Sequence, residues 1–242
     1  MDAPPIPWPD WKPLKQGPLL ISFSGIDGAG KTTQIDDLVS ALHEAGLRVR
    51  LIDFWDEIAT FRRLREALGH AVLRGEIGVG APGKPVNRRD KNIQNPFTIS
   101  ARMFLCLFDA IGMNFTLAKI RRARDGDVIV FDRYLYDQLV NLGLRYRASR
   151  LYIRLLLKVI PRPDLAFLID ADPALARARK PEYPLDFLHN ARNCYLAITK
   201  IAGMDVIHAG SPQEVSNSIR NVFAAKLGRF FDSAVPRFLT GT

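Results

Sequence analysis

The stretch Gly25–Thr33, with the sequence GIDGAGKTT, decides the fold of this chain. It follows a short apolar segment at 19–23 and precedes a segment, 34–45, whose apolar residues recur at helical spacing. The spacing G-x-x-x-x-G-K-S/T is that of a phosphate-binding loop, which needs a strand before it and a helix after it. The sequence therefore predicts a site for the phosphates of a nucleoside triphosphate.

The residues of this loop have distinct predicted contributions to phosphate binding. Glycines let the backbone turn tightly so that its N–H groups point at phosphate oxygens, and the helix start adds the positive end of its dipole. Lys31 supplies a charge for the outer phosphates, and the Thr32 hydroxyl is a ligand for Mg²⁺. The predicted phosphate-binding residues are Gly25, Gly28, Ala29, Gly30, Lys31, Thr32 and Thr33.

Composition limits the classes of partner. The 242 residues carry a net charge of +9, but the basic residues are spread along the chain without interleaved aromatic residues, so we expect no nucleic-acid partner. No apolar run approaches the roughly 20 residues that span a bilayer, and the N-terminus lacks a signal-peptide core. We therefore expect a cytoplasmic protein without a membrane partner. Cys106 and Cys194 lack metal-ligand spacing, and we expect both to be reduced.

Strand and helix patterns alternate along the chain. They predict a P-loop, three-layer α/β fold with a five-stranded parallel sheet and helices on both faces. The predicted strands lie at about 18–24, 48–53, 128–131, 165–169 and 205–208. Helices after the first are predicted at about 57–74, 97–124, 134–144, 148–160, 185–202 and 212–226, with a short one from Pro173 towards Arg179. This domain covers 18–228, after a proline-rich arm, 1–17, that contains Trp8 and Trp11, and before a tail, 229–242. A long basic loop at 75–95 is expected to be functional rather than idle.

A second chemical site follows the apolar strand at 128–131. Asp132-Arg133-Tyr134 stands at its carboxyl end, where ligands bind in open α/β sheets. Asp132 therefore lies near the phosphate-binding loop, suited to Mg²⁺ or its waters. Arg133 offers a fork of donors that matches a phosphate.

With these motifs the chain resembles the thymidylate kinase family over roughly 19–226. The shared motifs are Gly25–Thr33 with Gln34, Asp132-Arg133-Tyr134, Pro163-Asp164-Leu165, Ala174-Leu175-Ala176-Arg177, Arg192 and Tyr195-Leu196. The resemblance implies a kinase that uses ATP and Mg²⁺ to phosphorylate a nucleoside monophosphate, dTMP first. It also implies a homodimer formed through helices like 97–122.

The resemblance further implies roles for individual residues. Asp27 would contact the sugar of the acceptor, and Arg133 would hold its phosphate. Arg177 would lie against adenine, with the loop around Gly210 on the other edge. Residues 178–190 would form a lid. Because Gly28 stands where some relatives have an arginine, the catalytic cations would come from the lid; Arg179 and Lys180 are the candidates, with Arg192 behind them.

Two departures from the family leave the acceptor open. An arginine expected after the second strand is replaced by the acidic segment Asp53–Glu57, and Ile111 stands where an arginine would meet the base. One alternative is a deoxynucleoside kinase, or a kinase of another small hydroxyl acceptor, with Asp56 or Glu57 as general base. These acids are equally well explained as a helix N-terminal cap. A non-catalytic NTP-binding protein is a third class.

Overall fold

The computed structural model describes residues 17–59, 96–123, 126–142 and 146–234. Its centre is one sheet of five parallel strands in the order β2-β3-β1-β4-β5, which confirms the predicted sheet. The strands are β1 (Leu19–Ser24), β2 (Val49–Asp53), β3 (Val128–Asp132), β4 (Leu165–Asp170) and β5 (Asp205–His208). All five carboxyl ends meet at one edge, so the segments that follow them are placed side by side.

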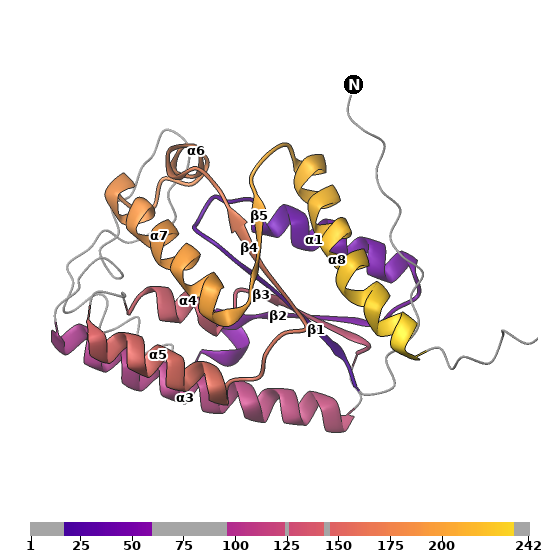
Figure 1. The fold of residues 1–242 in the computed structure, drawn as a ribbon, viewed down its shortest axis with the longest axis horizontal. Helices are drawn as coiled ribbons and strands as arrows, with labels where there is room; N and C mark the ends of the chain where they lie inside the picture. Colours follow the sequence, from indigo (N-terminus) through magenta and orange to yellow (C-terminus); the bar gives the residue numbers. More distant parts are fainter. Residues whose placement is uncertain (1–16, 60–95, 124–125, 143–145, 235–242) are drawn as a thin grey trace, which may run out of the picture.

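Helices cover both faces of the sheet (Figure 1). They are α1 (Lys31–Glu44), η1 (Phe54–Ile58), α3 (Pro96–Ala123), α4 (Leu135–Val140), α5 (Arg147–Val159), α6 (Pro173–Arg179), α7 (Leu185–Ala202) and α8 (Pro212–Ala234). Helices α1 and α8 lie together on one face, and α3, α4, α5 and α7 lie on the other. The arrangement is the predicted three-layer α/β fold.

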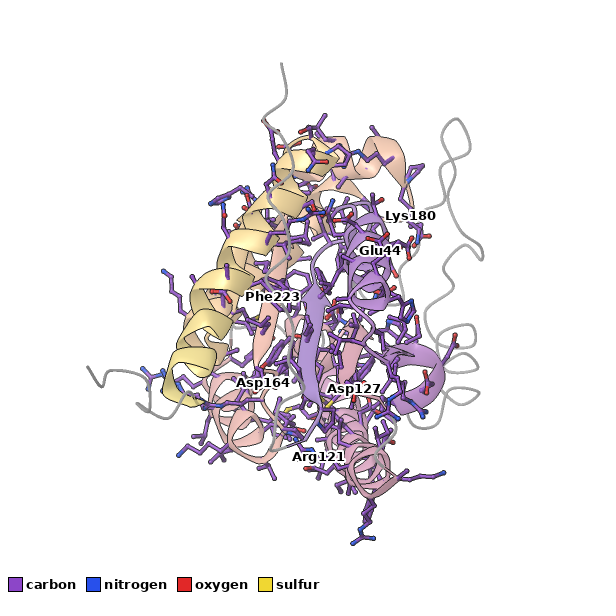
Figure 2. All side chains as sticks on the ribbon, turned by 90° about the vertical axis from the view of Figure 1, so that its right-hand side faces the viewer. Glu44, Arg121, Asp127, Asp164, Lys180 and Phe223 are labelled. Carbon is purple, nitrogen blue, oxygen red and sulfur yellow. The ribbon has the colours of Figure 1, made fainter. Side chains whose placement is uncertain are left out.

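The core lies between these layers because the central strands are apolar on both faces. Every residue of β1 and β4 is buried, as expected for parallel strands covered by helices on each side. Phe223 of α8 is fully buried on the side of the helix that faces the sheet (Figure 2). At the amino-terminal edge of the sheet, the Asp164 carboxylate accepts a hydrogen bond from the Leu20 backbone N–H at 2.8 Å. This residue of the Pro-Asp-Leu motif therefore joins β4 to β1, opposite the edge that carries the phosphate-binding loop.

Three segments differ from the prediction. The segment after β2 begins as a single π-helical turn, η1, rather than as an α-helix. Helix α4 ends at Val140, and α8 continues to Ala234, so the predicted domain end at 228 falls inside a helix. The predicted arm up to residue 16, the rest of the helix predicted at 57–74, and the loop 75–95 lie outside the described residues.

Candidate active site

The phosphate-binding loop connects β1 to α1 at the carboxyl edge of the sheet. Gly25 has a φ of 147°, and a β-carbon there would lie 2.6 Å from the Ile169 carbonyl oxygen. Gly28 has a φ of 83°, and its β-carbon would lie 2.2 Å from the carbonyl oxygen of Ala176 in α6. Both positions combine a left-handed or extended positive φ with a close backbone approach, so glycine is required at each. The loop thus packs closely against the end of β4 and against α6.

Lys31 is folded back onto this loop. Its Nζ donates to the carbonyl oxygens of Gly25 and Ile26, at 3.0 and 2.9 Å. Burial, and then the nearby charge of Arg133, lower the pKa of the Lys31 ammonium to about 8. Nearby carboxylates offset this lowering only in part. Bound phosphates would stabilise the charged ammonium and raise its pKa again.

Asp132 lies at the end of β3, paired in register with Phe23 on one neighbouring strand and Asp53 on the other. Burial raises the pKa of the Asp132 carboxyl, and the Asp53 carboxylate adds to the rise. A divalent cation would relieve that repulsion, and the Asp132 carboxylate and Thr32 hydroxyl are the oxygen ligands that Mg²⁺ takes. No group of three or more His, Cys, Asp or Glu side chains suited to a metal occurs among the described residues. An ion here would complete its shell with waters and phosphate oxygens.

Arg133 is held in an unusual backbone conformation. Its φ is 69°, in the left-handed region that residues with side chains rarely adopt, and its N–H donates to the Phe23 carbonyl oxygen at 3.0 Å. Its guanidinium donates one nitrogen to Asp27 and the other to Asp137, the latter at 3.1 Å. Burial alone lowers the pKa of Arg133, but these two carboxylates outweigh it and raise that pKa. The one arginine predicted to hold an acceptor phosphate thus already has two anionic partners.

Asp137 is a site residue that the sequence analysis did not identify. It is buried in α4, four residues after Arg133, and its carboxylate accepts four hydrogen bonds. The donors are Arg133 Nη1 at 3.1 Å, Tyr195 Oη at 2.7 Å, Ser24 Oγ at 2.6 Å and the Tyr134 backbone N–H at 3.1 Å. The available signal was an acid four residues after Arg133, the single charged residue of the short helix α4.

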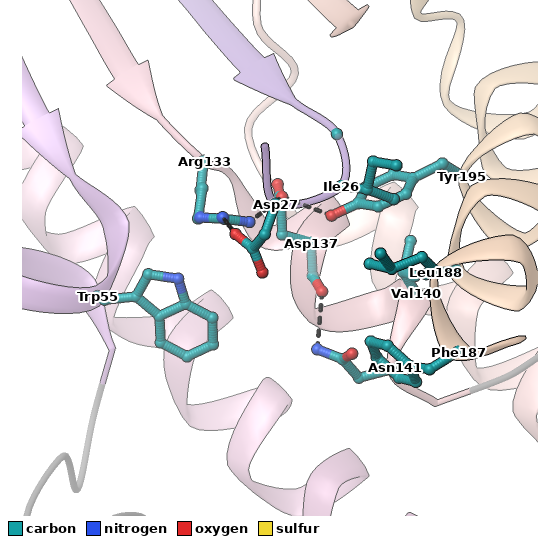
Figure 3. A pocket seen from close by; sticks show the side chains of 12 residues that line it. Ile26, Asp27, Trp55, Arg133, Asp137, Val140, Asn141, Phe187, Leu188 and Tyr195 are labelled. Carbon is teal, nitrogen blue, oxygen red and sulfur yellow. Dashed lines mark hydrogen bonds and ion pairs between the residues drawn. The ribbon is translucent and has the colours of Figure 1, made fainter. Parts of the chain in front are cut away.

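A pocket opens beside these charged groups (Figure 3). It is lined by Gly25, Ile26, Asp27, Trp55, Arg133, Asp137, Val140, Asn141, Phe187, Leu188, Ala191 and Tyr195. Figure 3 shows Asp27, Arg133 and Asp137 together in the middle, with Trp55 on one side and α7 on the other. Aromatic side chains around a polar centre suit a planar ring with polar substituents. Asp27 and Arg133 were predicted for an acceptor site, and the structure brings them together here.

The acidic segment after β2 does not supply a carboxylate to this pocket. Asp53 caps η1 by accepting from the backbone N–H groups of Trp55 and Asp56, at 2.8 and 3.0 Å. Glu57 pairs with Arg50 at 3.4 Å, and Asp56 is exposed. Asp53 is therefore the capping side chain, and Asp56 and Glu57 lie in the first turn of η1 rather than at the predicted cap position. Trp55 is the pocket residue of this segment.

The long helix α3 presents neither Ile111 nor Phe104 to the pocket. Ile111 is exposed, as is Phe104, which packs edge-on against Phe108 with ring centroids 4.7 Å apart. Phe104 therefore does not belong to the core, although helical spacing pairs it with Phe108. Ile111, which stands where the family would have a base-contacting arginine, is not among the residues that line the pocket.

The predicted donor-side residues lie in the segments that follow β4 and β5: α6, α7 and the loop after β5. Arg179 approaches the loop, with Nη1 3.5 Å from the Gly28 carbonyl oxygen. Arg177 donates to the Tyr183 carbonyl oxygen at 3.0 Å, and Gly210 lies exposed after β5. Arg192 forms a two-bond pair with Asp170, at 2.6 and 2.8 Å, so its donors are engaged at the end of β4.

The predicted lid, 178–190, comprises the end of α6, a five-residue connection and the start of α7. Within the connection, Glu182 and Tyr183 are buried. The segment is short and packed in this structure, and its action as a lid stays a prediction.

The sheet order, the phosphate-binding loop and the adjoining pocket define a P-loop α/β protein of the nucleotide-kinase class. Comparison with solved structures agrees on the fold. The thymidylate kinase of Ehrlichia chaffeensis matches 86% of this chain and 99% of its own, with a TM-score of 0.53 at 19% identity. The thymidylate kinase of Candida albicans matches 87% and 93%, with a TM-score of 0.57 at 16% identity.

Sequence relatives carry the same name. A probable thymidylate kinase of Archaeoglobus fulgidus is 25% identical over 217 residues, covering 86% of this chain and 96% of the relative. The thymidylate kinase of Bifidobacterium longum is 28% identical over 215 residues, covering 86% and 94%. No protein-family model matches the chain. The chain is a divergent relative of the thymidylate kinases, as its motifs indicate, and a phosphotransferase of that type.

Proposed function

We propose that this enzyme transfers the γ-phosphoryl group of ATP to a nucleoside monophosphate, dTMP first. One observation carries the proposal: Asp27 belongs both to the phosphate-binding loop and to the lining of the aromatic-walled pocket. A donor bound on the loop would therefore place its outer phosphate at the mouth of the acceptor pocket. Phosphoryl transfer depends mainly on such positioning and on charge stabilisation.

On the donor side, the loop residues from Gly25 to Thr33 would bind the ATP phosphates. Lys31 would stabilise the charge on the transferring group, since its ammonium already points into the loop. Thr32 and Asp132 would hold Mg²⁺, which supplies charge neutralisation of the phosphate oxygens when bound. Arg179 would add a cation from beside Gly28, and Arg177 and Gly210 would flank adenine.

On the acceptor side, the pocket would hold the nucleotide with its base near Trp55 and its phosphate near Arg133. Arg133 can accept a phosphate if Asp27 turns from the guanidinium towards the sugar. Asp137 would stay in place, because its four hydrogen bonds fix it. Asp137 is thus a positioning residue that orients Arg133.

One observation favours a second candidate, a kinase of a neutral hydroxyl acceptor such as a deoxynucleoside. Arg133 is flanked by two carboxylates, so the pocket centre offers little net positive charge to a dianionic phosphate. A hydroxyl acceptor needs no such charge but does need a general base. Glu57 is engaged with Arg50 outside the pocket, so Asp27 is the pocket carboxylate placed for that role.

The expectations about partners and location stay predictions. Composition predicts a cytoplasmic protein that does not bind nucleic acid. The motifs predict that it acts on nucleotides. A homodimer follows from the family resemblance alone, and sedimentation of the purified chain tests it.

A coupled assay of ADP release, with product analysis, tests the proposed function. The acceptors are dTMP, dUMP, thymidine and the other deoxynucleosides, each with ATP and Mg²⁺. We expect the highest kcat/KM with dTMP. Faster turnover of thymidine than of dTMP would instead support the hydroxyl-acceptor candidate, and ATP hydrolysis without any phosphorylated acceptor would contradict both.

A further inference from the structure

Gln34 is a residue of the shared motif that the proposed reaction does not use. It follows the phosphate-binding loop directly and lies in the first turn of α1, three residues after Lys31. Its side chain is 5% exposed, and its Nε2 donates to the carbonyl oxygen of Pro212, the first residue of α8, at 3.1 Å. Its Oε1 is buried and accepts no hydrogen bond from the residues that the structure describes. Packing alone does not explain this amide, because an unpaired buried acceptor is destabilising.

The hydrogen bond from Gln34 holds the connection between β5 and α8, residues 209–211. Helices α1 and α8 lie together on one face of the sheet (Figure 1). At the start of the connection, the Ala209 N–H donates to the carbonyl oxygen of Asp170, the last residue of β4, at 2.9 Å. Just after its end, Pro212 accepts from Gln34. The connection is therefore tied on one side to β4 and on the other to the helix that begins in the phosphate-binding loop.

The connection is also fixed internally. Ser211 and Glu214 form a capping box, in which the Glu214 carboxylate accepts from the Ser211 N–H at 2.8 Å and Ser211 Oγ accepts from the Glu214 N–H at 3.3 Å. A β-carbon at Gly210 would lie 2.6 Å from the Glu214 carboxylate, so the carboxylate occupies space that a side chain there would need. Because the connection has one shape, its position beside the site depends on where its two ends are held.

The order of the strands places this connection on the donor side of the phosphate-binding loop. The middle strand is β1, with β3 and β2 on one side and β4 and β5 on the other. The acceptor pocket includes Trp55, from the segment after β2, and Arg133, from the segment after β3. A nucleotide whose outer phosphate faces that pocket would extend its nucleoside towards the carboxyl ends of β4 and β5. Residues 209–211 are therefore placed to contact the nucleoside, whereas the loop from Gly25 to Thr33 binds the phosphates.

We propose that Gln34 is a positioning residue for the donor nucleotide: by tying residues 209–211 to α1, it fixes the separation between the nucleoside contacts and the phosphate contacts of ATP. The inference rests on the proposed donor site. Two sets of contacts with one ligand reinforce each other only when their separation is set before the ligand binds. Loss of the tie should therefore weaken binding of the whole nucleotide and leave binding of its phosphates unchanged.

Calorimetry of the full chain with two ligands tests the proposal. The ligands are ATP without an acceptor and inorganic tripolyphosphate, each with Mg²⁺; they share the triphosphate and differ in the nucleoside. Gln34→Met keeps the length of the side chain but removes the amide. We expect ATP binding to weaken about fivefold, as for the loss of one hydrogen bond, and tripolyphosphate binding to change less than about twofold. The melting temperature should not fall, because the variant also removes the unpaired Oε1.

The matched control is Gln213→Met, the same change at the residue after Pro212. It removes a hydrogen bond that stays within α8, from Gln213 Nε2 to Asn217 Oδ1 at 3.1 Å, and should bind both ligands like the unchanged protein. If Gln34→Met does not fold, Gln34→Asn gives the same comparison, because its amide is too short to reach Pro212.

Three results would overturn the proposal. Equal losses with ATP and tripolyphosphate would assign Gln34 to the phosphate-binding loop or to overall stability. Unchanged ATP binding in Gln34→Met, or the same loss in Gln213→Met, would show that the tie does not position the nucleotide. If the unchanged protein bound neither ligand, the proposed donor site would fail together with this inference, so the two failures are distinguishable.

Discussion

The phosphate-binding loop and the acceptor pocket share Asp27 but hold their charges differently. In the loop, the Lys31 ammonium donates hydrogen bonds to two backbone carbonyl oxygens, and the other predicted phosphate contacts are backbone N–H groups. In the pocket, Arg133 lies between Asp27 and Asp137. The loop presents its positive charge to a ligand directly. In the pocket, Asp27 must first turn away from Arg133 before the guanidinium can bind a phosphate. The difference separates a donor site that is ready for an anion from an acceptor site whose preferred charge has to be measured.

Lys31→Ala gives the largest effect expected. Loss of the ammonium removes the cation closest to the transferring group and should lower kcat by about 10³-fold, as for other cationic stabilisers of this reaction. Steady-state ADP release measures it, with Lys200→Ala, an exposed lysine of α7, as the matched control. Near-normal turnover in Lys31→Ala would contradict the donor half of the proposed site.

Asp137→Asn tests the acceptor half of the comparison. The change removes one negative charge beside Arg133 while keeping the shape of the side chain. The kcat/KM for a dianionic acceptor should therefore rise relative to that for a neutral one. We expect the ratio of kcat/KM for dTMP to that for thymidine to rise about tenfold. A purely structural role would lower both values together, and urea unfolding shows how much stability is lost. An unchanged ratio would mean that Asp137 does not set the charge of the pocket.

Nucleotide affinity should depend on pH through Lys31. Its pKa of about 8 in the nucleotide-free protein is lowered by burial and by Arg133, and bound phosphates would raise it again. Affinity is therefore greatest below pH 8 and falls as the pH rises through 8, because the free protein then loses the proton that the complex keeps. Between pH 7 and pH 9 calorimetry should show severalfold weaker ADP binding, at most about tenfold. In Lys31→Met the profile should be flat; a similar fall there would assign it to another group.

Glu57→Gln is expected to have the smallest effect. Glu57 forms a partly exposed pair with Arg50 outside the pocket, and such pairs contribute about 1 kcal/mol or less. Turnover of dTMP and of thymidine should each change less than about twofold in the coupled assay. A large loss confined to thymidine would restore Glu57 as a general base.

Local patterns in the sequence predicted most of the fold. The five strands and the helices α3, α5 and α7 lie within about two residues of their predicted positions, because apolar runs and caps act over short distances. The comparisons with known proteins confirmed the resemblance that these motifs carried. The segment after β2 was predicted less well, since Asp53 captures two backbone N–H groups and starts η1 at once.

The sequence by itself determined the phosphate-binding loop, since Gly25, Gly28 and Lys31 belong to one continuous segment whose spacing defines the motif. Only the tertiary structure decided the character of the acceptor pocket. The carboxylate of Asp137 meets Ser24, Arg133 and Tyr195 because β1, α4 and α7 converge, and Ser24 and Tyr195 are 113 and 58 residues away in the chain. Side-chain networks between distant segments depend on packing, which no local pattern encodes.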